Sequence, residues 1–344
     1  MRFLSDNSGG ASPEILDAVV AANSGLEHAY GDDRWSRRLD QVFGEFFGAE
    51  VRVFPVATGT AANSLALATV TPPYGAIFTH EEAHVVRDEC GAPELFSGGA
   101  RLITIAGAQG KLTVEGLTRA LESNPPSVHS VQPAALTLTQ ASEFGTVYGS
   151  AEIAALADVA HARHLAVHMD GARFANALVT LGCHPSETTW RAGVDVLSFG
   201  ATKNGALGAE AVVFFDLKRV TDFEFRRKSA GHLLSKSRYA AAQLLAYIES
   251  GVWRRNAERT NRLAQRIGAA AAERLLAPVQ ANEVFVRLSD EAKRALRSAG
   301  FEFYDWGAER SCAVRFVVSW DQAEEDVRAL CAALAHPNTR ISPK

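Results

Sequence analysis

The stretch from Leu165 to Lys203 constrains the fold of this chain more than any other part of it. An apolar run at residues 165–169 leads directly into Asp170, and a second run at residues 195–199 leads through small residues to Lys203. The two ionisable side chains lie about one β-α-β crossover apart, a unit of roughly 30 residues. We therefore predict that Asp170 and Lys203 lie at the carboxyl ends of parallel strands, the edge where open α/β sheets bind ligands.

Asp170 and Lys203 also have complementary chemistry. A lysine amine can form an imine with an aldehyde, and a carboxylate can pair with a protonated pyridine nitrogen. These are the two protein groups that pyridoxal phosphate requires. The working hypothesis from this stretch is therefore a pyridoxal-phosphate site.

Strand-like and helical patterns alternate along the first two thirds of the chain, without an internal repeat. Strands are predicted at residues 51–56, 102–105, 134–140, 165–170, 195–199 and 210–215. Helices are predicted from Pro13, around residues 35–47, through Val70, and at residues 114–121 and 151–163. This alternation predicts an α/β fold with a mostly parallel sheet flanked by helices.

The last part of the chain changes character. An alanine-rich helical pattern at residues 240–276 predicts a long connector. A small α+β unit should follow, with strands at 284–288, 301–304 and 313–319 and helices at 289–299 and 321–334. With 344 residues, two domains are expected. We place a large cofactor-binding domain, which includes the N-terminal arm, at residues 1–250 and a small C-terminal domain at 251–344.

Composition excludes several classes of function. The net charge is −4 and no cluster of basic residues dominates the sequence, so we expect no nucleic-acid partner. Apolar runs are too short for a membrane span, and the N-terminus lacks the apolar core of a signal peptide. The four cysteines are far apart, which favours reduced thiols in a cytoplasmic protein and gives no metal-ligand spacing. No metal site is expected.

The segment after the first strand is a candidate anion site. Thr58, Gly59 and Thr60 lie between a strand and a helix, where free main-chain N–H groups and the helix dipole attract negative charge. Tight turns of this kind also occur without a ligand. The segment lacks the lysine of a P-loop and the glycine pattern of a dinucleotide site.

Three further segments leave two interpretations open. Residues 28–34, which include Tyr30, can be a solvated turn or a loop that lines a site. The basic run at residues 226–236 can be a solvated helix end or a phosphate partner. Arg315 is a cation within an apolar strand, and burying it is unfavourable unless it is paired or faces a site.

Taken in order, these motifs resemble the low-specificity L-threonine aldolase family. The resemblance covers nearly the whole chain and is weaker in the last third. It depends on Ser5-Asp6, Tyr30-Gly31-Asp32-Asp33, Thr58-Gly59-Thr60, His84, Asp170-Gly171-Ala172-Arg173 and Thr202-Lys203. It implies the aspartate-aminotransferase-like architecture of fold-type I pyridoxal-phosphate enzymes.

The resemblance also implies roles for these residues. Lys203 would hold the cofactor as an imine, Asp170 would pair with its ring nitrogen, and His84 would stack on its ring. The cofactor phosphate would be bound by Thr58, Gly59 and Thr60, with Thr202 nearby and with Lys236 or Ser235 from an adjacent subunit. The substrate carboxylate would be held by Ser5, Arg173 and Arg315, since a guanidinium matches a carboxylate, and Tyr30 would contribute to substrate binding.

The implied reaction is retro-aldol cleavage of L-threonine, L-allo-threonine and related β-hydroxy-α-amino acids to glycine and an aldehyde, through an external aldimine. The general base stays open among His84, His129, Asp88 and a bound water. Glu143 stands where many family members have a histidine. The family implies a homo-oligomer, a dimer or a homotetramer, with shared active sites.

Two other functions remain in view. The first is another pyridoxal-phosphate enzyme of this fold, such as a phenylserine aldolase, a β-eliminating lyase or an amino-acid racemase. It would use the same Asp170 and Lys203, so release of an aldehyde distinguishes the aldolase. The second is a non-catalytic metabolite-binding protein.

Overall fold

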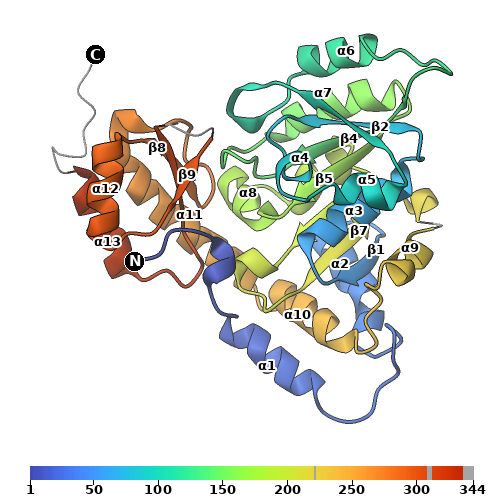
Figure 1. Cartoon of the computed structure of the whole chain (residues 1–344). Helices are drawn as coiled ribbons and strands as arrows, with labels where there is room; N and C mark the ends of the chain where they lie inside the picture. The colour runs from blue at the N-terminus through green and yellow to red at the C-terminus, as the bar shows by residue number, and fades with distance from the viewer. Residues whose placement is uncertain (221, 308–311, 336–344) are drawn as a thin grey trace.

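The computed structural model describes residues 1–220, 222–307 and 312–335, and within them a seven-stranded sheet organises the larger part of the molecule (Figure 1). Its strands are β1 (Arg52–Val56), β2 (Gly75–His80), β3 (Arg101–Ile105), β4 (Gln132–Thr139), β5 (Ala166–Gly171), β6 (Val196–Gly200) and β7 (Glu210–Phe214). They are arranged in the order β1-β7-β6-β5-β4-β2-β3. β7 is antiparallel to both of its neighbours, and the other pairs are parallel. The predicted mostly parallel sheet is confirmed.

The register of this sheet brings the polar strand ends together. Asp170 of β5 lies opposite Thr139 of β4 and Ser198 of β6. Glu210 begins β7 between Val56 of β1 and Gly200 of β6. These strand ends therefore share one edge of the sheet, where ligands bind in open α/β folds.

Helices cover both faces of the sheet (Figure 1), as a parallel sheet requires. The helices of this part of the molecule are α1 (Pro13–Ala22), α2 (Leu39–Phe47), α3 (Gly59–Val70), α4 (His84–Arg87), α5 (Ala92–Ser97), α6 (Val114–Glu122), α7 (Ser150–His161), α8 (Phe174–Leu181), α9 (Phe223–Ser229) and α10 (Arg238–Glu249), of which α1 packs on α10 rather than on the sheet. Adjacent strand residues belong to different apolar clusters: Val196 shares a cluster with Leu65 of α3, whereas Leu197 shares one with Phe43 of α2. The central strands β5, β6 and β7 are buried on both faces, which is why most of their residues are apolar.

The small C-terminal unit has its own sheet and core (Figure 1). It contains α11 (Val252–Ala271), β8 (Glu283–Arg287), α12 (Asp290–Ser298), β9 (Tyr304–Trp306), β10 (Ala313–Val317) and α13 (Glu324–Ala335). The strands form an antiparallel sheet in the order β8-β10-β9. The predicted α+β unit is confirmed.

The first residues of the N-terminal arm pack against the C-terminal unit. Phe3 is fully buried in the core of the C-terminal unit. Its main-chain N–H donates to Glu302 at 2.8 Å, and its carbonyl accepts from Val317 at 2.9 Å. The arm thus pairs with the backbone of Glu302 and of Val317, the last residue of β10. The ring of Phe3 packs edge-on against that of Phe316.

The long connector is two helices rather than one. Gly251 adopts a left-handed φ of +71° between α10 and α11, a conformation that favours glycine and ends a helix. The domain boundary between residues 250 and 251 stays a prediction. None of the helices in the described ranges is both long and apolar enough to cross a membrane.

Candidate active site

A cavity of about 360 Å³ opens at the carboxyl ends of β4, β5 and β6. Its size falls within the usual range for small-molecule sites, about 300–1,000 Å³. The predicted site residues that line it are Thr58, Gly59, Thr60, His84, Asp170, Arg173, Thr202 and Lys203. Residues far apart in the sequence therefore face one space, and among them are the lysine and the aspartate that the hypothesis requires.

Two glycines allow the strand ends to approach. A Cβ atom at Gly200 would lie 2.7 Å from Cα of Ala172, and one at Gly171 would lie 2.7 Å from the carbonyl oxygen of Ser198. Larger residues would push β5 and β6 apart at this point. Lys203 follows in a single turn of 3₁₀ helix, η6 (Thr202–Asn204), so its position depends directly on this close contact.

Asp170 is held by two donors. Nδ2 of Asn63 donates to Oδ2 at 2.8 Å, and the main-chain N–H of Ala172 donates to Oδ1 at 3.0 Å. Hydrogen bonds to an ionised carboxylate are among the stronger ones, so the orientation of Asp170 is well defined. Asn63 was not predicted as a site residue. It lies four residues after Gly59 on α3, which places the two on one helix face.

Beneath Asp170, a polar row crosses three strands. The ring of His168 lies 2.7 Å from Oγ1 of Thr137 through Nδ1 and 2.9 Å from Oγ of Ser198 through Nε2. Burial lowers the pKa of His168 to about 4. The imidazole is therefore neutral near pH 7 and forms part of the structural support of the site.

His84 is paired with a buried glutamate. Its Nδ1 lies 2.8 Å from Oε1 of Glu89, and the same oxygen accepts a 2.8 Å hydrogen bond from Asn63. The hydrogen bond to Glu89 raises the pKa of His84, more than burial lowers it. Burial in turn raises the pKa of Glu89. Asn63 thus links the His84–Glu89 pair to Asp170.

Asp88 and His129, two of the predicted candidates for the base, do not line the cavity of their own chain. Asp88 is an exposed residue at the end of α4, and it is the next residue, Glu89, that turns inward to His84. His129 is exposed in the turn before β4, at the amino end of a strand whose carboxyl end lines the cavity. His129 therefore lies a full strand length away from the cavity.

Glu143 lines the cavity beside His84. Its Oε1 accepts the main-chain N–H of His84 at 3.1 Å. Withdrawal from water, together with the nearby charge of Asp170, raises the pKa of Glu143 to about 7. A carboxyl group with this pKa can exchange a proton near neutral pH.

The segment at the start of α3 forms a cradle. Oγ1 of Thr58 caps the helix by accepting the N–H of Ala61 at 3.1 Å. The N–H groups of Gly59 and Thr60 have no hydrogen-bond partner among the described residues, as expected for a first helical turn. A Cβ at Gly59 would meet nothing within 4 Å, so there is room for an anion at this helix N-terminus.

Glu210 faces the cavity between this cradle and Lys203, and it was not predicted. Its Oε2 accepts the N–H of Ala201 at 3.2 Å. Burial raises the pKa of Glu210 to about 7, against the charge of Lys203 and hydrogen bonds from residues 201 and 202. It therefore anchors the segment that carries Lys203.

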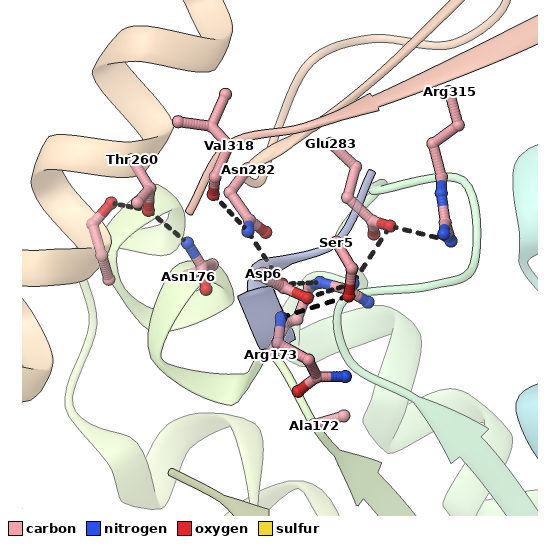
Figure 2. Close-up of polar contacts among 12 residues, drawn as sticks. Ser5, Asp6, Ala172, Arg173, Asn176, Thr260, Asn282, Glu283, Arg315 and Val318 are labelled. Carbon is pink, nitrogen blue, oxygen red and sulfur yellow. Dashed lines mark hydrogen bonds and ion pairs between the residues drawn. The ribbon is translucent and has the colours of Figure 1, made fainter. Parts of the chain in front are cut away.

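The candidate carboxylate-binding residues lie near the N-terminal arm (Figure 2). Arg173 lines the cavity, whereas within the described residues neither Ser5 nor Arg315 does. Ser5 caps the short helix η1 (Asp6–Ser8) by accepting the N–H of Asn7 at 3.1 Å, and Asn7 itself lines the cavity. Arg315 reaches toward Glu283 from β10.

Tyr30 and Lys236 lie together but outside this cavity. The N–H of Tyr30 donates to the carbonyl of Ser235 at 3.0 Å, and both Tyr30 and Lys236 are exposed. A shallow pocket that Lys236 lines is shared with residues 25–29. These two predicted residues therefore do not reach the site of their own chain.

The groups around the cavity fit pyridoxal phosphate. Lys203 supplies an amine for its aldehyde, and Asp170 supplies an oriented carboxylate for its ring nitrogen. The cradle at Thr58, Gly59 and Thr60 offers unpaired N–H groups for its phosphate. The fold and this site together define a pyridoxal-phosphate enzyme.

Comparisons with known proteins define the class more closely. The model of the beta-eliminating lyase family matches residues 2–291. The low-specificity L-threonine aldolase of Pseudomonas sp. (strain NCIMB 10558) is 43% identical over 335 residues, which cover 96% of each chain. The enzyme of the same description from Pseudomonas aeruginosa is 44% identical over 333 residues, 96% of this chain and 95% of its own.

A solved structure agrees with the fold. The threonine aldolase of Leishmania major superposes with a TM-score of 0.91 at 24% identity, over 97% of this chain and 98% of its own. The chain belongs to the beta-eliminating lyase family and, within it, to the low-specificity L-threonine aldolases. The predictions of family, fold class and pyridoxal-phosphate dependence are confirmed.

Proposed function

We propose that this chain cleaves L-threonine, L-allo-threonine and related β-hydroxy-α-amino acids to glycine and an aldehyde, with the roles described below. The observation that carries the proposal is the meeting of Lys203, Asp170, Arg173 and Glu143 around one cavity. These four side chains can respectively hold an aldehyde, pair with a pyridine nitrogen, bind a carboxylate and accept a proton.

Pyridoxal phosphate supplies an aldehyde that captures the substrate amine and a ring that accepts the electron pair of the broken Cα–Cβ bond. Lys203 would hold it before the substrate arrives, and Asp170 would keep its ring nitrogen protonated. His84 would lie against its ring. Its phosphate would be bound by the cradle at Thr58, Gly59 and Thr60, with Thr202 nearby.

The protein residues then orient and deprotonate the substrate. Arg173 binds the α-carboxylate, which sets the direction of the Cα–Cβ bond, the orientational part of catalysis. Glu143 accepts the proton of the β-hydroxyl group, so that the β-carbon leaves as an aldehyde. Glu143 is preferred to His84 as the base because its pKa lies near 7, whereas the raised pKa of His84 keeps that ring protonated over a wider pH range.

We test the function with the purified chain loaded with pyridoxal phosphate. The holoenzyme is expected to absorb visible light and to release aldehyde and glycine from L-threonine, L-allo-threonine and phenylserine. The Lys203→Ala variant should lose both the imine absorbance and the activity. Release of ammonia and a keto acid would instead indicate a β-eliminating lyase, and a D-amino acid without aldehyde would indicate a racemase.

The proposal includes a homo-oligomer in which subunits complete each other's sites, a dimer or a tetramer of dimers. Tyr30 and Lys236 support it, because both are exposed and lie away from the cavity of their own chain. On α1, Leu16 is 44% exposed and Val20 is 72% exposed. These exposed apolar side chains would be covered by a second copy of the chain.

We also propose that the chain works in the cytoplasm. All four of its cysteines are free thiols, and Cys90 and Cys312 are exposed. Exposed thiols persist in a reducing compartment. Fractionation of cells that express the chain would test this location, and recovery from an oxidising compartment would contradict it.

A further inference from the structure

Arg173 is already bound by two carboxylates (Figure 2). Its Nε donates to Oδ2 of Asp6 at 2.8 Å and its Nη2 donates to Oδ1 of Asp6 at 3.1 Å. This is the side-on, bidentate arrangement of a guanidinium and a carboxylate. Oε1 of Glu283 lies 3.2 Å from the same Nη2. A substrate carboxylate can therefore bind Arg173 bidentately only at the end-on pair, Nη1 and Nη2, and Glu283 lies against one of these atoms.

Asp6 and Glu283 differ in how firmly they are held. Asp6 accepts hydrogen bonds from two nitrogens of Arg173 and from Nδ2 of Asn282 at 3.0 Å. Burial alone would raise the pKa of Asp6, but the charges of Arg173 and Lys203 outweigh it and lower that pKa. Asp6 is thus a fixed, ionised partner of Arg173.

Glu283 is buried without a hydrogen bond. Its side chain is 1% exposed, and neither carboxylate oxygen has a hydrogen-bond partner among the described residues. It makes ion pairs with Nη2 of Arg173 at 3.2 Å and with Nη1 of Arg315 at 3.6 Å. A buried carboxylate in this state is attracted by both cations and satisfied by neither.

Arg315 can accept Glu283 more closely. Its Nε is buried and has no hydrogen-bond partner among the described residues. Its guanidinium lies 5.0 Å from the ring centre of Trp306 and 5.8 Å from that of Tyr304. These two aromatic rings of the C-terminal unit hold the guanidinium in place. A small displacement of Glu283 toward Arg315 would release Nη2 of Arg173.

The charge balance of the cluster points the same way. Asp6 and Glu283 neutralise Arg173 and Arg315 as the structure stands. A substrate carboxylate therefore adds a third negative charge to two positive ones. In a site this buried, juxtaposed like charges are unfavourable, so a substrate carboxylate at Arg173 favours withdrawal of Glu283 from Nη2 of that residue.

We propose that Glu283 is an internal competitor of the substrate carboxylate, which occupies Arg173 in the free enzyme and moves to Arg315 when an amino acid binds. Glu283 thereby sets the affinity for α-carboxylates without taking part in the chemical step. This inference depends on the proposed function, because it assumes that Arg173 receives the substrate carboxylate.

The test compares ligands with and without a carboxylate in the Glu283→Gln holoenzyme. Binding is followed through the visible spectrum with glycine and with glycinamide, its uncharged analogue. Removal of the competing charge is expected to lower the Kd of glycine and the KM of L-threonine about tenfold, to leave kcat within about twofold, and to change the Kd of glycinamide little. The matched Asp6→Asn variant should act in the opposite direction and raise the KM of L-threonine, because it removes the fixed partner.

An unchanged or increased KM of L-threonine in Glu283→Gln would overturn the proposal. If Glu283 only positioned Arg173, its replacement would raise the KM, as is expected for Asp6→Asn. Circular dichroism and the affinity for pyridoxal phosphate establish that the variant is folded. If it is not, Glu283→Asp keeps the charge but shortens the side chain by one methylene, and a smaller decrease in the Kd of glycine is expected; an increase refutes the inference. Failure of the proposed function is distinguishable, because the wild-type enzyme would then release no aldehyde.

Discussion

Glu143 and His84 meet in the cavity through the hydrogen bond from the main-chain N–H of His84 to the Glu143 carboxylate. Both side chains have a raised pKa, but for different reasons. Withdrawal from water dominates for Glu143, and the hydrogen bond to Glu89 dominates for His84. The same part of the cavity therefore contains a carboxyl group that titrates near pH 7 and an imidazole that stays protonated to higher pH than usual.

The role of Glu143 predicts a pH dependence. As a base it must be ionised, and its pKa of about 7 means that kcat/KM should rise as the pH increases through about 7. Glu143→Gln should lower kcat/KM by about 10²–10⁴-fold, the usual contribution of a general base, and should remove the rise. The pH profile of aldehyde release from L-threonine measures both effects. Glu115→Gln, which changes an exposed glutamate of α6, is the control. A wild-type pH profile in Glu143→Gln would exclude Glu143 as the base.

At the scale of elements, the polar row of Thr137, His168 and Ser198 joins β4, β5 and β6 directly beneath Asp170. Both ring nitrogens of His168 have partners, so the buried imidazole is satisfied in its neutral form. The strands that carry Asp170 and lead to Lys203 are thereby tied by side chains as well as by their main-chain hydrogen bonds. The row stabilises the sheet at the point where the site is built.

This row predicts that acid weakens the fold. The pKa of His168 is about 4 in the folded chain and 6.5 in the reference state. The unfolded chain therefore binds the proton first, and the contribution of His168 is complete above pH 6.5 and is lost as the pH falls from 6.5 to about 4. It amounts to roughly 3 kcal/mol at most. Urea unfolding at several pH values should show this loss in wild type and a weaker one in His168→Gln.

Exposed His129 supplies the matched control for that measurement. His129→Gln should retain the full pH dependence of the free energy of unfolding, because its ring makes no buried contact. If the free energy of unfolding depends on pH equally in wild type and in His168→Gln, carboxyl groups alone account for the acid sensitivity.

At the scale of the whole molecule, the N-terminal arm joins the two cores (Figure 1). Phe3 is buried in the C-terminal unit, Asp6 binds Arg173 at the cavity, and α1 packs against α10 of the large part. The cluster of Asp6, Arg173, Glu283 and Arg315 is therefore assembled from three separate regions of the chain. The proposed binding of substrate at Arg173 would therefore be coupled to the contact between the two units.

The proposed sharing of active sites between subunits predicts complementation between inactive variants. In a mixed dimer of Lys203→Ala and Lys236→Ala chains, one of the two sites retains both lysines if Lys236 comes from the partner. Random mixing should restore about a quarter of the wild-type activity, measured at a pyridoxal-phosphate concentration that does not load Lys236→Ala alone. A mixture of Lys203→Ala with Asp170→Ala should stay inactive, because both residues line the cavity of one chain. No recovery in the first mixture would mean that each chain completes its own site.

Local patterns were sufficient to predict the framework. Apolar runs before Asp170 and Lys203 predicted adjacent strands with both residues at one edge, and the structure shows both strands and one cavity. The strand-turn-helix pattern likewise placed Thr58, Gly59 and Thr60 at a helix start, and α3 begins at Gly59 with Thr58 as its N-cap. Such features depend on residues within one or two elements, where side-chain period and turn chemistry act directly.

Long-range packing decided the partners within that framework. Glu89 rather than Asp88 reaches His84, Asn63 links this pair to Asp170, and Glu283 faces Arg173 across the boundary between the two units. The N-terminal arm joined the C-terminal unit for the same reason. These contacts connect segments that lie far apart in the chain, and their distances are set by how whole helices and sheets pack, which no local pattern of residues records.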